Sequence, residues 1–100
     1  MKILKLKDGR REYYYVWLVQ EPRSYGTHKR GVAVSIEKDS WDKDYNVTRW
    51  SISDYGKGPK VGSGWGLYQH LPNKQLALKA AKQALSILIK QKSKYTWNIK

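Results

Sequence analysis

Strict alternation of apolar and polar side chains is the feature that most limits how this chain can fold. A strand is expected at 31–38, where the branched aliphatic residues Val32, Val34 and Ile36 take alternate positions and the residues between them are small. A β-strand has this period of two, because successive side chains point to opposite faces of the sheet. The same alternation at 46–53 and an aromatic, β-branched run at 12–19 predict two more strands, and a short fourth strand is expected at 64–69.

A single long helix is expected at 73–92. Asn73 follows Pro72 and suits an N-cap, and no glycine or proline occurs from there to residue 92. Strands first and one helix last predict an α+β fold, in which an antiparallel sheet of three to four strands is packed on one face by the C-terminal helix. One hundred residues suffice for one domain, and we expect residues 1–100 to form it.

This helix carries more apolar residues than contact with one sheet requires. At about 100° per residue, alanines and leucines cover most of its circumference. Leu78, Ile87 and Ile89 then need a further cover. Two covers remain open: the C-terminal residues 95–99, or a second copy of the chain in a homodimer.

Glycine, proline and polar residues mark the connections between the expected elements. Residues 8–9 predict a turn, and residues 21–26 predict the end of the first strand. The acidic segment 38–45 and the glycine-rich segment 56–66 are expected to be loops.

Positive charge is concentrated in the second half of the chain. The formal net charge is +12; residues 1–54 hold eleven bases and all eight acids, whereas residues 55–100 hold nine lysines and no acid. A basic surface without counter-charges repels itself, which favours a partner that supplies anions. Nucleic acid is the commonest such partner, and we expect DNA in preference to RNA and duplex DNA in preference to single strands. A basic surface without a specific partner is the simpler alternative.

The face of the sheet away from the helix is the expected contact surface. We expect the helix to cover the aliphatic sets, which are Tyr14, Val16 and Leu18, then Val32, Val34 and Ile36, then Trp50 and Ile52. The other face would then present Tyr13, Tyr15 and Trp17 beside Arg49 and the small residues Ala33, Ser35 and Ser51. Aromatic rings beside small neighbours leave room for a stacked base. Alternatively, these rings pack against the C-terminal residues or across a dimer interface.

Basic loops would add phosphate contacts around that face. Lysines beside bare glycine amides suit a phosphate backbone, although the glycine-rich segment is not a P-loop. The expected nucleic-acid-binding residues are Tyr13, Tyr15, Trp17, Arg23, Lys29, Arg30, Arg49, Lys57 and Lys60.

Three segments together resemble known DNA-binding domains. Arg49-Trp50-Ser51-Ile52, then Gly56-Lys57-Gly58, then the alanine-rich helix are similar to the plant AP2 type and to the arm-binding domains of tyrosine integrases. The resemblance implies a three-stranded sheet that enters the major groove of duplex DNA and is backed by one helix. Residues 80–85 also resemble the last helix of double-stranded-RNA-binding domains, but residues 1–12 do not match the first helix of that family.

Catalysis is not expected. The chain has no cysteine and only two histidines, which excludes thiolate chemistry and a histidine-rich metal site, so neither a cofactor nor a metal is expected. A small ribonuclease that uses His28 or His70 as a general base is a minor alternative. No apolar run reaches the length of a membrane span, and we expect a cytoplasmic protein without membrane contact.

A binding protein of a different class would use the same features. An interaction or inhibitor protein with an acidic protein partner would also need basic residues and aromatic anchors. We keep this as the alternative to nucleic-acid binding.

Overall fold

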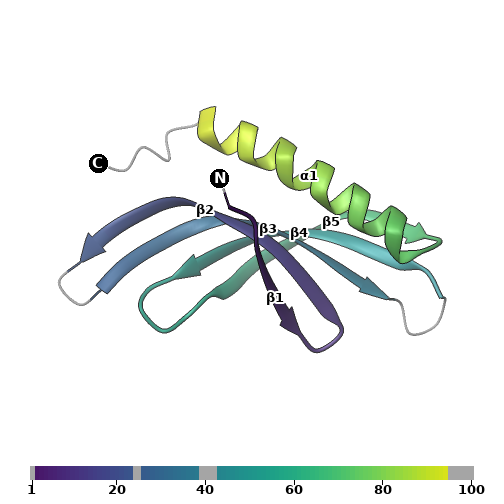
Figure 1. The fold of residues 1–100 in the computed structure, drawn as a ribbon, viewed down its shortest axis with the longest axis horizontal. Helices are drawn as coiled ribbons and strands as arrows, with labels where there is room; N and C mark the ends of the chain where they lie inside the picture. Colours follow the sequence, from purple (N-terminus) through teal and green to yellow (C-terminus); the bar gives the residue numbers. More distant parts are fainter. Residues whose placement is uncertain (1, 24–25, 39–42, 95–100) are drawn as a thin grey trace.

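The structure, a computed structural model, describes residues 2–23, 26–38 and 43–94. They form five strands and one helix in the order β1 (Leu4–Asp8), β2 (Arg11–Arg23), β3 (Gly26–Lys38), β4 (Tyr45–Asp54), β5 (Lys60–Leu71) and α1 (Lys74–Lys94). The strands make one antiparallel sheet in sequence order, and α1 lies across one face (Figure 1). The predicted α+β class is confirmed, with more strands than the three to four expected.

β1 is the strand that the prediction lacked. Leu4 and Leu6 alternate with Lys5 and Lys7, and the strand pairs with β2 across a tight turn at Gly9, which has a positive φ of 61°. The segment is short and highly charged, and the prediction therefore omits a strand here although its side chains alternate with a period of two. The turn expected at residues 8–9 is confirmed.

The segment expected to be a loop at 56–66 is mostly strand. β5 begins at Lys60 and contains Gly62, Gly64 and Gly66. Added Cβ atoms at Gly62 and Gly64 would lie 2.5 Å from the Ser51 hydroxyl and 2.3 Å from the Trp50 ring, respectively. Here glycine permits close packing against β4 and does not signal a loop.

Helix α1 begins as predicted and packs closely on the sheet. The side chain of Asn73 accepts a hydrogen bond from the backbone amide of Leu76 at 2.9 Å, as an N-cap does. Ala77, Ala81 and Ala84 are buried, and their small side chains allow the helix axis to approach the strands. Leu78 and Ile89 pack against the same core, whereas Ile87 is exposed; residues 95–99, one of the two expected covers, lie outside the described residues.

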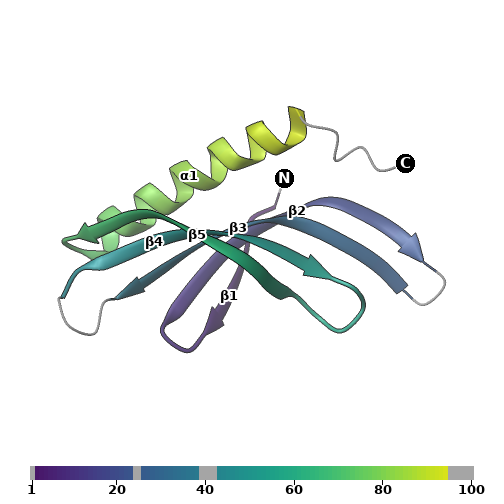
Figure 2. The ribbon, with the colours of Figure 1, turned by 180° about the vertical axis from the view of Figure 1, so that it is seen from behind.

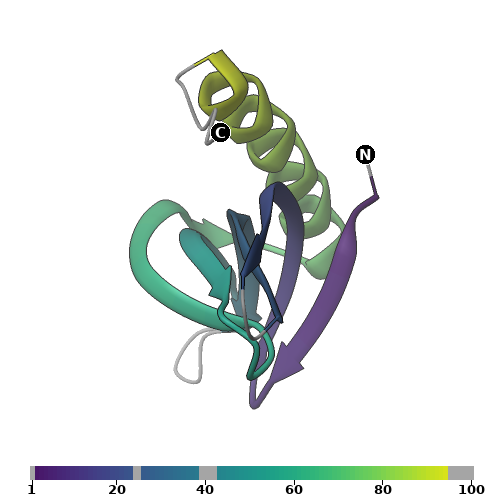
Figure 3. The same cartoon turned by 90° about the vertical axis from the view of Figure 1, so that its left-hand side faces the viewer.

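Two separate hydrophobic clusters hold the sheet. The cluster under α1 includes Val16, Val32, Val34, Ile36, Val47 and Leu85, with Tyr14 and Leu18 at its margin. The sheet curls strongly away from the helix (Figures 2 and 3). Its other side, here called the inner face, holds a second cluster. That cluster contains Tyr15, Ala33 and Ile52, packed with Leu4, Leu6, Trp17, Trp50 and Val61.

The expected faces of the first two long strands are confirmed, but that of β4 is inverted. Val47 pairs with Ile36 and lies in the core under α1, whereas Trp50 pairs with Ala33 and lies on the inner face with Ile52. The expectation assumed one core, and it therefore assigned the larger apolar residues to the helix. The curled sheet has a second core, which takes Trp50 and Ile52.

Candidate nucleic-acid interface

Tyr13 and Tyr15 are core residues and not a stacking surface. Their exposed fractions are only 3% and 7%. Tyr13 makes an edge contact with Trp50 and Tyr15 makes one with Trp17, with ring centroids 5.9 and 5.3 Å apart. Burial, with a smaller contribution from Asp54, raises the pKa of the Tyr15 phenol. The expectation that these two rings receive bases is corrected, because the curl of the sheet covers them.

Two cationic side chains of the inner face lie against its aromatic rings. The Arg11 guanidinium lies 4.9 Å from the Trp50 ring centroid and donates a 2.9 Å hydrogen bond to Glu37. That hydrogen bond, with a contribution from Tyr13, raises the pKa of Arg11. Lys29 lies 5.9 Å from the centroid of the half-buried Trp17. This face is therefore filled by its own side chains.

Arg49 lies on the face that α1 covers, not beside Tyr13 as expected. It pairs with Val34 on one side and with Trp65 on the other. Its guanidinium is 5.3 Å from the Trp65 ring centroid, and Trp65 is 66% exposed. A cation against an aromatic ring holds that ring in place while most of its surface stays open to solvent.

A groove runs from this pair to the helix. It has a volume of about 180 Å³, and its lining includes Arg49, Ser51, Ser63, Trp65 and Leu88. No acidic side chain lines it among the described residues. The groove combines an exposed ring, a guanidinium and two hydroxyl groups, which are the groups that bind a nucleobase and its phosphate.

The β4–β5 hairpin exposes lysines, but two of its glycine amides already donate hydrogen bonds within the hairpin. The carboxylate of Asp54 accepts hydrogen bonds from the amides of Gly56 and Gly58 at 2.8 and 3.2 Å. The expectation of glycine amides free for phosphate is corrected for these two groups. Lys57 and Lys60 are exposed.

Arg23 and Arg30, which were expected to contact phosphates, belong to the β2–β3 hairpin. Arg30 forms an ion pair with Glu21 at 3.8 Å, which lowers its availability to phosphate. Arg23 ends β2, and its side chain lies outside the described part of the chain. The expected residues are therefore divided between the two faces and the hairpins.

Trp65 is the residue that the sequence prediction missed. It stands between Gly64 and Gly66, and with Tyr68 it contributes exposed aromatic surface to the edge strand β5. An aromatic residue flanked by glycines in an edge strand is a signal that the sequence already contained. Trp65 is absent from the expected binding residues because residues 56–66 were expected to form a loop.

The two histidines, which are the general-base candidates of the ribonuclease alternative, lie in different strands, His28 in β3 and His70 in β5. His28 packs edge-on against Tyr55, and Nδ1 of His70 lies 3.5 Å from Asp44. Within the described ranges, no three His, Asp or Glu side chains come together as a metal ion requires.

The part of the chain that the structure describes also has no helix that is long and apolar enough to cross a membrane. Comparisons with protein-family models, curated proteins and solved structures find no match to this chain.

Proposed function

We propose that this chain is a small non-enzymatic protein that binds single-stranded DNA through the groove beside Arg49 and Trp65. The observation that carries the proposal is the Trp65 ring, which is 66% exposed and has the Arg49 guanidinium 5.3 Å from its centroid. A base stacked on an aromatic side chain contributes about 1–3 kcal/mol without sequence preference. Arg49 would pair with the adjoining phosphate.

A single strand fits this surface better than the duplex DNA that the sequence analysis and the resemblance favour. The sheet would have to offer open side chains to a major groove, but its inner face is packed with aromatic rings. Stacking on Trp65 needs an unpaired base. Neither stacking nor phosphate pairing requires a ribose 2′-hydroxyl, so a DNA strand offers every group that these contacts use.

The surrounding charge supports binding of a polyanion. β5 and α1 contain no acidic residue, and Lys57 and Lys60 stand in the hairpin at the start of β5. These lysines lie where a strand leaving the groove along β5 would meet them. Their positive charge would attract the backbone over a distance of about 8–10 Å at moderate salt.

The test is a fluorescence anisotropy titration of a labelled single-stranded oligonucleotide with three proteins, which are the wild type and the variants Trp65→Leu and Trp65→Tyr. We expect Trp65→Leu to weaken binding by about five- to 150-fold and Trp65→Tyr to retain most of the affinity, because only the second keeps a ring. Both substitutions are at an exposed position, and circular dichroism checks the fold. Equal affinity of Trp65→Leu and the wild type would refute the proposal, and an RNA oligomer of the same sequence tests the preference for DNA.

An acidic protein partner is a second candidate, and one observation favours it. Leu76 and Ile87 are 45% and 53% exposed on α1, and each has a lysine three positions later, Lys79 and Lys90. Residues three apart are neighbours on a helix surface, so apolar and cationic groups lie side by side. A salt-tolerant, stoichiometric protein complex that Ile87→Asp abolishes and Trp65→Leu preserves would favour this candidate. Absorbance at 260 nm that high salt removes from the preparation would favour nucleic acid.

A further inference from the structure

A second cavity, of about 470 Å³, lies at the start of α1, and four of its lining residues are cations. Lys7 and Arg10 come from the β1–β2 hairpin, Lys38 from the end of β3, and Lys74 from the first turn of the helix. Three segments far apart in sequence therefore bring basic side chains to one place. We refer to this cavity as the basic pocket.

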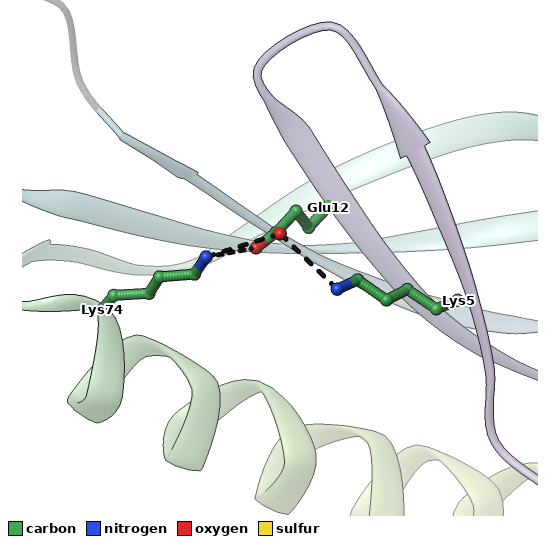
Figure 4. A network of polar contacts seen from close by, with 3 residues as sticks. All are labelled: Lys5, Glu12 and Lys74. Atoms are coloured by element: carbon green, nitrogen blue, oxygen red, sulfur yellow. Dashed lines mark hydrogen bonds and ion pairs between the residues drawn. The ribbon is translucent and has the colours of Figure 1, made fainter.

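One carboxylate lies in the basic pocket, and it is already shared by two lysines. The Glu12 oxygens are 3.3 and 3.4 Å from Nζ of Lys74, and one of them is 3.7 Å from Nζ of Lys5 (Figure 4). The Glu12 side chain is 14% exposed, so it is held in place on the sheet. Among the described residues of the lining, no second acid stands opposite the charges of Lys7, Arg10 and Lys38.

The remaining polar groups of the lining are donors. The side chains of Lys7, Arg10 and Lys38 are exposed, and the half-buried Tyr45 adds a hydroxyl. An arginine fork binds two oxygens of a phosphate, and lysines add point charges around it. The volume falls within the range of small-molecule sites, which is about 300–1,000 Å³. A tetrahedral dianion is the ligand that these groups would neutralise.

We propose that the basic pocket binds the phosphate group of a phosphomonoester. This inference goes beyond the DNA-binding proposal and does not depend on it, because the pocket shares no lining residue with the groove at Trp65. Lys74 and Leu88 mark the two sites on α1, and at about 1.5 Å per residue they are roughly 21 Å apart along the helix. The phosphate could belong to a free nucleotide or to the 5′ end of a strand.

Calorimetric titrations with inorganic phosphate and with a nucleoside 5′-monophosphate test the proposal at low salt. We expect the double variant Arg10→Gln/Lys38→Gln to lose at least about tenfold in affinity, because it removes charge-assisted hydrogen bonds. The matched control is Lys57→Gln/Lys60→Gln, which removes the same charge from the β4–β5 hairpin and should stay within about twofold of the wild type. Equal losses in both double variants, or no phosphate binding by the wild type, would overturn the proposal.

Two further measurements distinguish the possible sources of the phosphate group and separate this proposal from the DNA-binding proposal. Tighter binding of a 5′-phosphorylated oligonucleotide than of its 5′-hydroxyl counterpart, lost in Arg10→Gln/Lys38→Gln, identifies a strand end as the source. Equal binding of the two oligonucleotides, with phosphate and mononucleotide still bound, identifies a free phosphate. Trp65→Leu should leave phosphate binding unchanged, so failure of the groove and failure of the basic pocket are distinguishable. All variants alter exposed side chains, and their circular dichroism spectra and thermal melts should match the wild type.

Discussion

The indole nitrogen of Trp50 donates a 2.8 Å hydrogen bond to the hydroxyl of Ser35 on the inner face of the sheet. Ser35 is buried, and it is one of the few polar side chains in the described interior. The bond joins β3 to β4 and fixes the Trp50 ring where it packs on Tyr13 and over Gly64. It thereby organises the second core, which lies on the inner face of the sheet.

Ser35→Ala is expected to destabilise the fold. The substitution leaves the N–H of the half-buried Trp50 without its partner, which costs about 0.5–1.5 kcal/mol. At this chain length, each kcal/mol lowers Tm by about 4–8 °C. Thermal melts followed by circular dichroism measure the change, and Ser86→Ala on the exposed face of α1 is the control. An unchanged Tm for Ser35→Ala would show that the hydrogen bond contributes nothing.

Gly64→Ala and Gly66→Ala should differ sharply although they lie two positions apart. A Cβ at Gly64 would be 2.3 Å from the Trp50 ring, which Ser35 holds in place, whereas nothing lies within 4 Å of a Cβ at Gly66. We expect a loss of about 1–3 kcal/mol for Gly64→Ala from overpacking. Gly66→Ala should be neutral or slightly stabilising. Urea denaturation of both variants measures the difference, and equal stabilities would contradict the packing described here.

Glu12→Gln should lower stability in a salt-dependent way. α1 has no acid in its first turn, and Glu12 of β2 supplies the negative charge there through its ion pair with Lys74. Because Lys5 and Lys74 are about half exposed, solvent screening limits the expected loss to about 0.5–1 kcal/mol at low salt. The loss should shrink near 1 M salt. Asp8→Asn is the control, and a loss that high salt leaves intact would argue against an electrostatic origin.

The stability of the protein should fall as pH rises above 10, in part through Tyr15. Burial raises the pKa of this phenol above its ordinary 10.0, so the folded chain keeps a proton that the unfolded chain releases. The stabilisation from the protonated phenol is complete below pH 10.0 and is lost as pH rises through the folded pKa. Urea denaturation between pH 8 and 11, an interval chosen about the ordinary pKa, should give a shallower decline for Tyr15→Phe. Tyr55→Phe, at an exposed ring, should follow the wild type.

Binding of single-stranded DNA should weaken with salt in proportion to the phosphates contacted. The logarithm of affinity falls by about 0.7 per phosphate for each tenfold rise in salt on a single strand. Arg49→Gln should reduce this slope by about 0.7, and Arg49→Lys should retain it because the charge remains. Titrations at several salt concentrations measure the slopes. Identical slopes for the wild type and Arg49→Gln would place Arg49 outside the phosphate contacts.

Local signals accounted for most of the secondary structure. The alternation at Val32, Val34 and Ile36 predicted a buried strand face, and the Asn73 cap predicted the helix start. These features depend on neighbours close in the chain, which is why one sequence suffices to find them. Gly62, Gly64 and Gly66 misled the prediction for β5, because a glycine required for close packing looks the same in sequence as a glycine required for a turn.

The candidate sites depended on relationships that a single strand does not contain. Trp50 and Val47 lie on opposite faces of β4, and both faces are buried, so apolar character alone did not decide which one met the helix. Arg49 therefore lies beside Trp65, and the cations of the basic pocket come from three segments that no local pattern connects. The sequence by itself determined the α+β class, the helix start and the excess of positive charge, because these follow from local period and composition. The curl of the sheet decided which rings are buried and which cations meet, because burial depends on strands that become neighbours only in the folded chain.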